Sequence, residues 1–326
     1  MNKSKNSDFS LRLRLFVSNN FSLFGLLVMI LIGTLVNPNY FPTLLNASNV
    51  LRQSVMVGLL CCGITFVIIS GHINLSISAV YAFSAFVSLW CLDRNPVLGI
   101  LGPIAMGVLV GLLCGIVILK MKVPPWVATL AMQLGVRGLL LTLAHNVVYK
   151  PHNPIPAFYT YLTQGSVFGL IPVPIVFAIL VYLIAGYVLN KTRLGRCIYA
   201  VGGNMEAARM MGINVNRTYI IAHMICCGLA ACAGIFLASR VGSAYPDSGT
   251  GYEMYAIASA ALGGVMLSGG KGKMSGAFIG MLIMSLITNV FNMQNTVDPN
   301  IEKVVTGSIL IIVLVAQKVG DVASKK

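Results

Sequence analysis

Apolar residues in this chain fall in long uninterrupted runs, among them FSLFGLLVMILIGTLV (21–36), ILGPIAMGVLVGLLCGIVIL (100–119) and IPVPIVFAILVYLIAGYVL (171–189). A bilayer core about 30 Å thick needs about 20 apolar residues per helix. Helices are required because backbone groups within lipid must bond inside their own segment. The pattern therefore predicts an all-α, polytopic membrane protein of about ten transmembrane helices. The expected spans are 21–37, 50–69, 73–91, 97–119, 125–144, 171–189, 217–238, 252–268, 274–292 and 303–318.

The charge distribution gives the expected orientation. The chain has 22 Lys and Arg against 8 Asp and Glu, a net charge of +14. If the N-terminus is cytoplasmic and the spans alternate, 16 of the 22 basic residues fall on the cytoplasmic side. This is the positive-inside pattern, so both termini are expected in the cytoplasm. The excess of basic residues then reports topology, and no nucleic acid partner is expected.

The spans divide the chain into a cytoplasmic tail (1–20), one transmembrane domain (21–318) and a second cytoplasmic tail (319–326). The first apolar run is expected to be retained as a helix, because NPNYFP follows it and no small-residue cleavage site is present. Two long connections stand out, 145–170 outside and 190–216 inside. The outer one contains Pro151, Pro154 and Pro156 and is expected to be irregular.

The sequence contains none of the residues that would let this chain drive uphill transport by itself. Coupled secondary transporters usually place a carboxylate inside the membrane, whereas Glu253 and Glu302 fall at span ends. The string MLSGGKGKM does not match a phosphate-binding loop, because Val265 and Gly272 stand where the motif needs Gly and Ser or Thr. No enzyme activity, cofactor or metal site is expected, and the eight cysteines form no C-x-x-C pair. Energy for any pumping would come from another subunit.

The inner connection contains a short helix signal in GGNMEAARMMG (202–212). Asn204 is a natural N-cap, Glu206 suits the first turn, and Gly212 suits the position after the C-cap. Ala207, Met210 and Met211 would share one face of this two-turn helix. So short a helix needs a surface to stabilise it. Both the membrane surface and a partner protein fit, and methionines make an adaptable contact surface.

The stretch GGNMEAARMMGIN resembles the coupling-helix loop of sugar-import permeases in ATP-binding-cassette (ABC) transporters, the family of the ribose, xylose, galactose, allose and autoinducer-2 permeases. ITFVIISGHINLSISAV (64–80), AYPDSGTGYEMYAIASAALGGVMLSGGKGKMSGAFIGMLI (244–283) and ITNVFNM (287–293) resemble further segments of the same family, in the same order. The resemblance implies a permease domain at 21–318 in a bacterial inner membrane. It also implies three kinds of partner: a second permease subunit in a homo- or heterodimer, two cytoplasmic ATPase subunits, and an external sugar-binding protein. The residues it assigns to the ATPase contact are Gly203, Asn204, Glu206, Ala207, Ala208, Arg209, Met210, Met211 and Gly212.

This chain departs from the family pattern Gly-Gly-Ile-Asp-Leu-Ser, because it reads Gly71-His72-Ile73-Asn74-Leu75-Ser76. Asn keeps the shape and capping ability of Asp without its charge. His72 has two readings, a packing residue or a group with a gating or pH role.

Apart from Arg137, the one clear charge in the middle of a span, the polar residues in the interior of the spans are uncharged, which suits a neutral sugar or related polyol. The same side chains also bond helices to one another, so both readings stand. Glycines 272, 276 and 280, spaced by four, favour close helix packing, whereas the doublets 263–264 and 269–270 fit packing or a broken helix along a path equally well. The alternative functions are an uncoupled channel for small neutral solutes and an ABC permease for a nucleoside or amino acid. The residues expected along the substrate path are Asn74, Ser76, Ser78, Asn289 and Asn292.

Overall fold

The computed structural model describes residues 21–167, 171–294 and 299–324, and these are mostly helical. The expected tail 1–20 and the last two residues of the tail 319–326 lie outside the described residues. Two-residue strands β1 (Ser166–Val167) and β2 (Ile171–Pro172) pair antiparallel. The helices are α2 (Phe21–Val36), α3 (Leu44–Ile69), α4 (Ile77–Leu92), α5 (Pro96–Met121), α6 (Pro125–Leu143), α7 (Ala157–Gln164), α8 (Val173–Lys191), α9 (Arg193–Gly203), α10 (Met205–Met210), α11 (Val215–Val241), α12 (Tyr252–Leu262), α13 (Met274–Asn292) and α14 (Pro299–Ser324).

The helices confirm an all-α polytopic membrane protein. Among the described residues, α3, α5, α6, α8, α11 and α13 are long and apolar enough to cross a membrane, and α2 and α4 are shorter apolar helices. Each expected span overlaps a helix, but the start of 73–91, before Ile77, and the last third of 252–268 are wrong. There α12 ends at Leu262, because Gly263 and Gly264 follow and the backbone of Gly264 turns to a positive φ of 80°.

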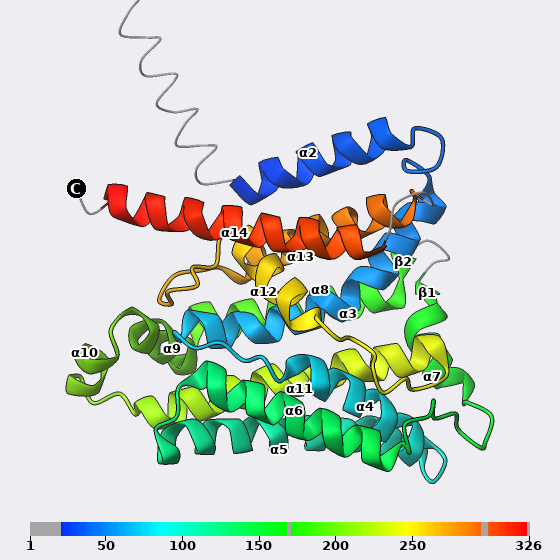
Figure 1. Cartoon of the computed structure of the whole chain (residues 1–326), viewed down its shortest axis with the longest axis horizontal. Coiled ribbons are helices and arrows are strands. Elements are labelled where there is room, and N and C mark those ends of the chain that lie inside the picture. The colour runs from blue at the N-terminus through cyan, green and yellow to red at the C-terminus, as the bar shows by residue number, and fades with distance from the viewer. Residues whose placement is uncertain (1–20, 168–170, 295–298, 325–326) are drawn as a thin grey trace, which may run out of the picture.

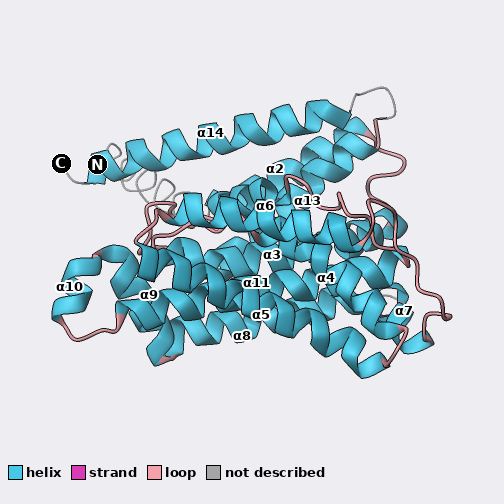
Figure 2. Cartoon of the chain, turned by 60° about the horizontal axis from the view of Figure 1, so that its bottom comes forward, coloured by secondary structure: helices cyan, strands magenta, loops and turns pink. Residues whose placement is uncertain are grey.

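The long helices run side by side, so that connections gather at the two ends of the bundle (Figure 1). One end carries α9 and α10, and the opposite end carries α7. Helix α14 ends at the same end of the bundle as α10 (Figures 1 and 2).

Helix α11 is the centre of the bundle and packs against α3, α4 and α5. Its closest neighbour is α5, whose Gly107, Gly111 and Gly115 face it at intervals of four residues. A Cβ atom at Gly111 would collide with the backbone carbonyl of His223. Small residues therefore set this helix–helix distance, as is common in membrane bundles.

Packing is also the role of Gly276 and Gly280, as their spacing predicted. A Cβ on Gly276 would collide with Gly263, and one on Gly280 with Ser259, so these glycines bring α13 directly onto α12.

The doublet 269–270 lies at a junction of three segments. The N–H of Gly270 donates to the carbonyl of Ile69 over 2.8 Å, and Gly202 packs so closely there that a Cβ would collide with the same carbonyl.

Both long connections contain structure that the sequence analysis missed. The outer one was expected to be irregular, but it forms α7 and the β1–β2 pair. The inner one forms α9 in addition to the predicted short helix. Thr192 caps α9 by accepting from the N–H of Gly195 over 3.3 Å, and Ile198 and Val201 are buried along one face.

Candidate functional site

Helix α10 confirms the short helix predicted in the inner connection. The Asn204 side chain caps it by accepting from the N–H of Ala207 over 3.0 Å. At its other end Gly212 has a φ of 77°, and the N–H groups of Gly212 and Ile213 donate to the carbonyls of Arg209 and Ala208. This is a complete glycine-terminated cap, which satisfies the carbonyls that the helix end would leave open.

One residue of α10 anchors it and the others face outward. Ala208 is fully buried in a small apolar cluster with Val201, Val215 and Tyr219, so its side chain is not part of the outer surface. Met210 is 91% exposed and Met211 is 69% exposed. The remaining predicted contact residues are exposed too: Gly203, Asn204, Glu206, Ala207, Arg209 and Gly212. Helix α10 projects from the end of the bundle (Figure 2), and its exposed methionines give it an apolar surface.

A hollow of about 450 Å³ lies between the starts of α9 and α11 and the connection 211–214 that follows α10. Arg193 and Arg217 line it together with Met211 and Gly212. The end of the bundle therefore offers a protruding helix next to a basic recess.

Asn74 and Ser76 lie in the non-helical segment 70–76, between α3 and α4, and both are fully buried. The side-chain oxygen of Asn74 accepts from the N–H of Ser76 over 3.0 Å and from its hydroxyl over 2.7 Å. The amide nitrogen of Asn74 lies 3.1 Å from Nδ1 of His223 and 3.4 Å from the sulfur of Cys227. These contacts fix the segment to α11.

Ser78 belongs to a polar cluster that joins α4, α6 and α12. Its hydroxyl accepts from the amide of Gln133 over 3.1 Å, and the same amide lies 3.4 Å from a carboxylate oxygen of Glu253. Glu253 is only 9% exposed, so this span-end acid is buried in the cluster. Nearby, Arg137 donates to the carbonyls of Pro246 and Ser248, which holds the 242–251 connection against α6.

Asn289 pairs with Asn46 through two amide hydrogen bonds of 3.0 and 3.3 Å, and so joins α13 to α3. The five residues predicted for the substrate path thus do not gather at one site: Asn74 and Ser76 bond to each other, and Ser78 and Asn289 belong to two other clusters. These four bond to the chain itself, whereas Asn292 lines a cavity.

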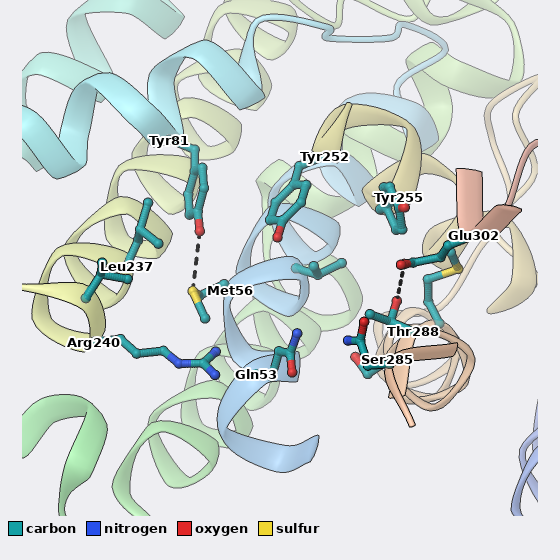
Figure 3. A pocket seen from close by; sticks show the side chains of 14 residues that line it. Gln53, Met56, Tyr81, Leu237, Arg240, Tyr252, Tyr255, Ser285, Thr288 and Glu302 are labelled. Carbon is teal, nitrogen blue, oxygen red and sulfur yellow. Dashed lines mark hydrogen bonds between the residues drawn. The ribbon is translucent and has the colours of Figure 1, made fainter. Parts of the chain in front are cut away.

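That cavity has a volume of about 340 Å³ and lies between α3, α4, α11, α12, α13 and α14 (Figure 3). Three tyrosines form one wall, namely Tyr81, Tyr252 and Tyr255. Two charged residues face it from different sides: Arg240 at the end of α11, and Glu302, whose carboxylate accepts from Thr288 over 2.9 Å. The other polar groups in the lining are Gln53, Ser285, Thr288 and Asn292.

The sequence analysis missed this cavity apart from Asn292, and its expectation of an uncharged polar lining does not hold here, because Arg240 and Glu302 are part of the lining. Its residues extend from Gln53 to Glu302 and come from six helices, so no local motif contains them. The pair Tyr252 and Tyr255, three residues apart beside the apolar run of α12, was the available local signal.

Comparison with known proteins identifies the family. The chain is 37% identical over 282 residues to the "Ribose import permease protein RbsC" of Escherichia coli (strain K12), covering 83% of this chain and 85% of that protein. It is 37% identical over 300 residues to RbsC of Bacillus subtilis (strain 168), with 90% and 91% covered. It is 35% identical over 276 residues to the "L-arabinose transport system permease protein AraH" of Escherichia coli (strain K12), with 84% and 82% covered.

No solved structure matches the chain in the same comparison. Residues 46–314 match the family described as "Branched-chain amino acid transport system / permease component". That region contains the segment 70–76, α10 and all but a few residues of the helices around the cavity. The chain therefore belongs to this family of transport-system permease components.

Proposed function

We propose that the chain is the permease subunit of a binding-protein-dependent ABC importer that passes a neutral sugar across a bacterial inner membrane. The relatives named for ribose and L-arabinose support a sugar as cargo, and a third, 34% identical, is named for D-allose. ATP hydrolysis is assigned to a separate subunit, because the one glycine-rich basic stretch of this sequence departs from the phosphate-binding motif.

The observation that carries this proposal is the exposed surface of α10. A chain that acted as an uncoupled channel would need no helix of six residues held outside the bundle by its own caps. The exposed Met210 and Met211, together with the basic recess beside them, suit a protein partner better than a lipid surface. We assign that partner as the ATPase. The buried Ala208 holds α10 against the bundle, and the exposed predicted residues around it provide the surface that contacts the ATPase.

The same assignment gives the orientation. The end of the bundle with α9 and α10 faces the cytoplasm, and the end with α7 meets the external sugar-binding protein. Both termini are then cytoplasmic, the helices of the permease domain 21–318 make about ten crossings, and a second permease subunit completes the unit.

The substrate path in this proposal runs through the cavity that Asn292 lines. The hydrogen bonds of Asn74, Ser76, Ser78 and Asn289 favour a role in holding the helices around the path. A permease for a nucleoside or an amino acid is the alternative within the same family.

The experiment is a co-purification of two variants with the ATPase subunit of the proposed importer. Ala207→Asp places a charge on the exposed face of α10, which the proposal buries against the ATPase. An unpaired buried charge costs several kcal/mol, and about 1.4 kcal/mol is already a tenfold loss of affinity. We expect Ala207→Asp to lose the ATPase while inserting normally, and Glu206→Gln to keep it. If both variants retain the ATPase equally, α10 is not the contact.

A further inference from the structure

We propose that the cavity between α3, α11, α12 and α13 is a binding site for one neutral monosaccharide, so that the permease subunit itself recognises the sugar. This inference rests on the proposed function, because it takes the chain to be a sugar permease. The inference goes further because it assigns recognition of the sugar to named side chains that line this cavity.

The first argument is that polar groups in the cavity lack partners. Elsewhere in the bundle the amides are paired: Asn46 with Asn289, Asn74 with Ser76 and His223. Within the described part of the chain, the side chains of Gln53, Arg240 and Asn292 make no hydrogen bond, and all three line the cavity. Gln53 is half-buried, and Arg240 and Asn292 are exposed. Polar groups that converge on a cavity without a protein partner are open to a ligand or to water.

The second argument is the aromatic wall. The rings of Tyr81 and Tyr252 lie 5.6 Å apart, and those of Tyr252 and Tyr255 lie 5.8 Å apart, so the three form a row along one side (Figure 3). The hydroxyl of Tyr81 donates to the sulfur of Met56 over 3.3 Å, which fixes the first ring. A sugar ring has faces of C–H groups and a rim of hydroxyls. Rigid aromatic faces suit the C–H groups, and amides and guanidinium at the opposite side suit the hydroxyls.

The third argument is size and charge. A volume of about 340 Å³ is near the lower end of the roughly 300–1,000 Å³ typical of small-molecule sites. It therefore suits a single sugar ring with a few waters and is small for an oligosaccharide. The lining contains one basic and one acidic side chain, Arg240 and Glu302, so the opposing charges disfavour a solute with a net charge. A zwitterion would satisfy this charge pattern too, so the choice of a sugar rests on the aromatic wall, and an amino acid serves as the competing probe in the test.

The unpaired state of Gln53 makes a clean test possible. Removing its amide breaks no hydrogen bond within the described chain, so Gln53→Ala should keep the fold. Gln164→Ala is the matched control, because Gln164 is an exposed amide on α7 that lies outside the cavity lining. Thermal unfolding should be the same for both variants and the unmodified chain.

The measurement is saturation-transfer NMR of the full-length chain in lipid nanodiscs, without binding protein, titrated with D-ribose, L-arabinose and D-allose. At least one sugar should bind, Gln53→Ala should bind it at least tenfold more weakly, and Gln164→Ala should be unchanged. L-Leucine and sucrose serve as probes that should not compete. Absence of sugar binding, equal binding by Gln53→Ala, or competition by leucine would each overturn the assignment.

Uptake by the assembled transporter separates this inference from the proposed function. If uptake needs the ATPase but Gln53→Ala transports normally and no sugar binds to the chain alone, the cavity assignment is wrong and the permease function stands. If uptake does not need the ATPase, the proposed function itself is wrong.

Discussion

The imidazole ring of His72 lies flat against the phenol ring of Tyr219, with ring centroids 3.7 Å apart and planes within 8°. His72 belongs to the non-helical segment 70–76, and Tyr219 belongs to the apolar cluster that buries Ala208 of α10. The stack therefore joins the segment inside the bundle to the anchor of the projecting helix. It favours the packing interpretation of His72.

Removing this stack should loosen α10. Aromatic pairs contribute about 0.5–1.5 kcal/mol beyond the area they bury, so His72→Ala should raise the amide hydrogen exchange of residues 205–211 several-fold. His72→Phe keeps a flat ring and should leave exchange near that of the unmodified protein. Equal exchange in His72→Ala and the unmodified protein would show that the stack does not support α10.

Helix packing at Gly111 should tolerate no side chain. A Cβ there meets the backbone of His223 and Met224, whereas nothing lies within 4 Å of a Cβ at Gly135. Overpacking costs about 1–3 kcal/mol, and Ala in place of Gly gains up to about 1 kcal/mol in an open helix position. Gly111→Ala should thus lower the thermal midpoint in detergent, and Gly135→Ala should leave it equal or higher. Equal midpoints for the two variants would contradict the packing of α5 on α11.

Asp93 should hold the outer connection over a wide pH range. Its partial burial raises the pKa, but hydrogen bonds from the N–H groups of Asn153 and His152 and from the hydroxyl of Tyr149 outweigh this effect and lower the pKa to about 2. Because the folded pKa lies below the unfolded value of about 3.9, the stabilisation is complete above about pH 5 and is lost progressively as the pH falls toward 2.

Exchange of the amides of His152 and Asn153, corrected for intrinsic rates, should therefore be constant from pH 7 to 5. Asp93→Asn should raise it at every pH, because removing the charged acceptor costs about 1–3 kcal/mol. Asp247→Asn is the control, since Asp247 is exposed and its carboxylate forms no hydrogen bond with the described residues. Protection of these amides that fell between pH 7 and 5 would count against this role of Asp93.

Helices that are defined by residues within their own turns could be predicted from the sequence, whereas features that depend on tertiary contacts could not. Helix α10 was predictable because Asn204 and Gly212 act within its own turns. Helix α9 has the same kind of signal, an N-cap at Thr192, but its short and partly polar sequence was interpreted as part of the connection. The prolines of the outer connection were read as breaks, although Pro156 stands directly before α7.

The polar residues inside the spans could not be sorted from sequence. Whether an amide bonds a helix or faces a cavity depends on what lies opposite, and for Asn289 that is Asn46, 243 positions away. Asn292 is less than one turn further along the chain and lines the cavity instead. No feature of the local sequence distinguishes the two.

Membrane topology has a direct test in two single cysteines. We expect Met210→Cys to react with a membrane-impermeant maleimide only after cell lysis, and His152→Cys to react on intact cells. Both positions are well exposed, at 91% for Met210 and 85% for the side chain of His152. The background should lack the partly exposed Cys91, Cys197 and Cys232. Labelling of Met210→Cys on intact cells would reverse the proposed orientation.

The central claim is that this chain moves a sugar only when a separate ATPase drives it. The most direct measurement is uptake of labelled sugar into proteoliposomes that contain the chain, with and without the ATPase and the sugar-binding protein, with ATP held constant and the proton gradient collapsed. We predict uptake against a gradient only when all components and ATP are present, with no effect of collapsing the proton gradient. Accumulation by this chain alone, or accumulation that stops when the proton gradient is removed, would contradict the account.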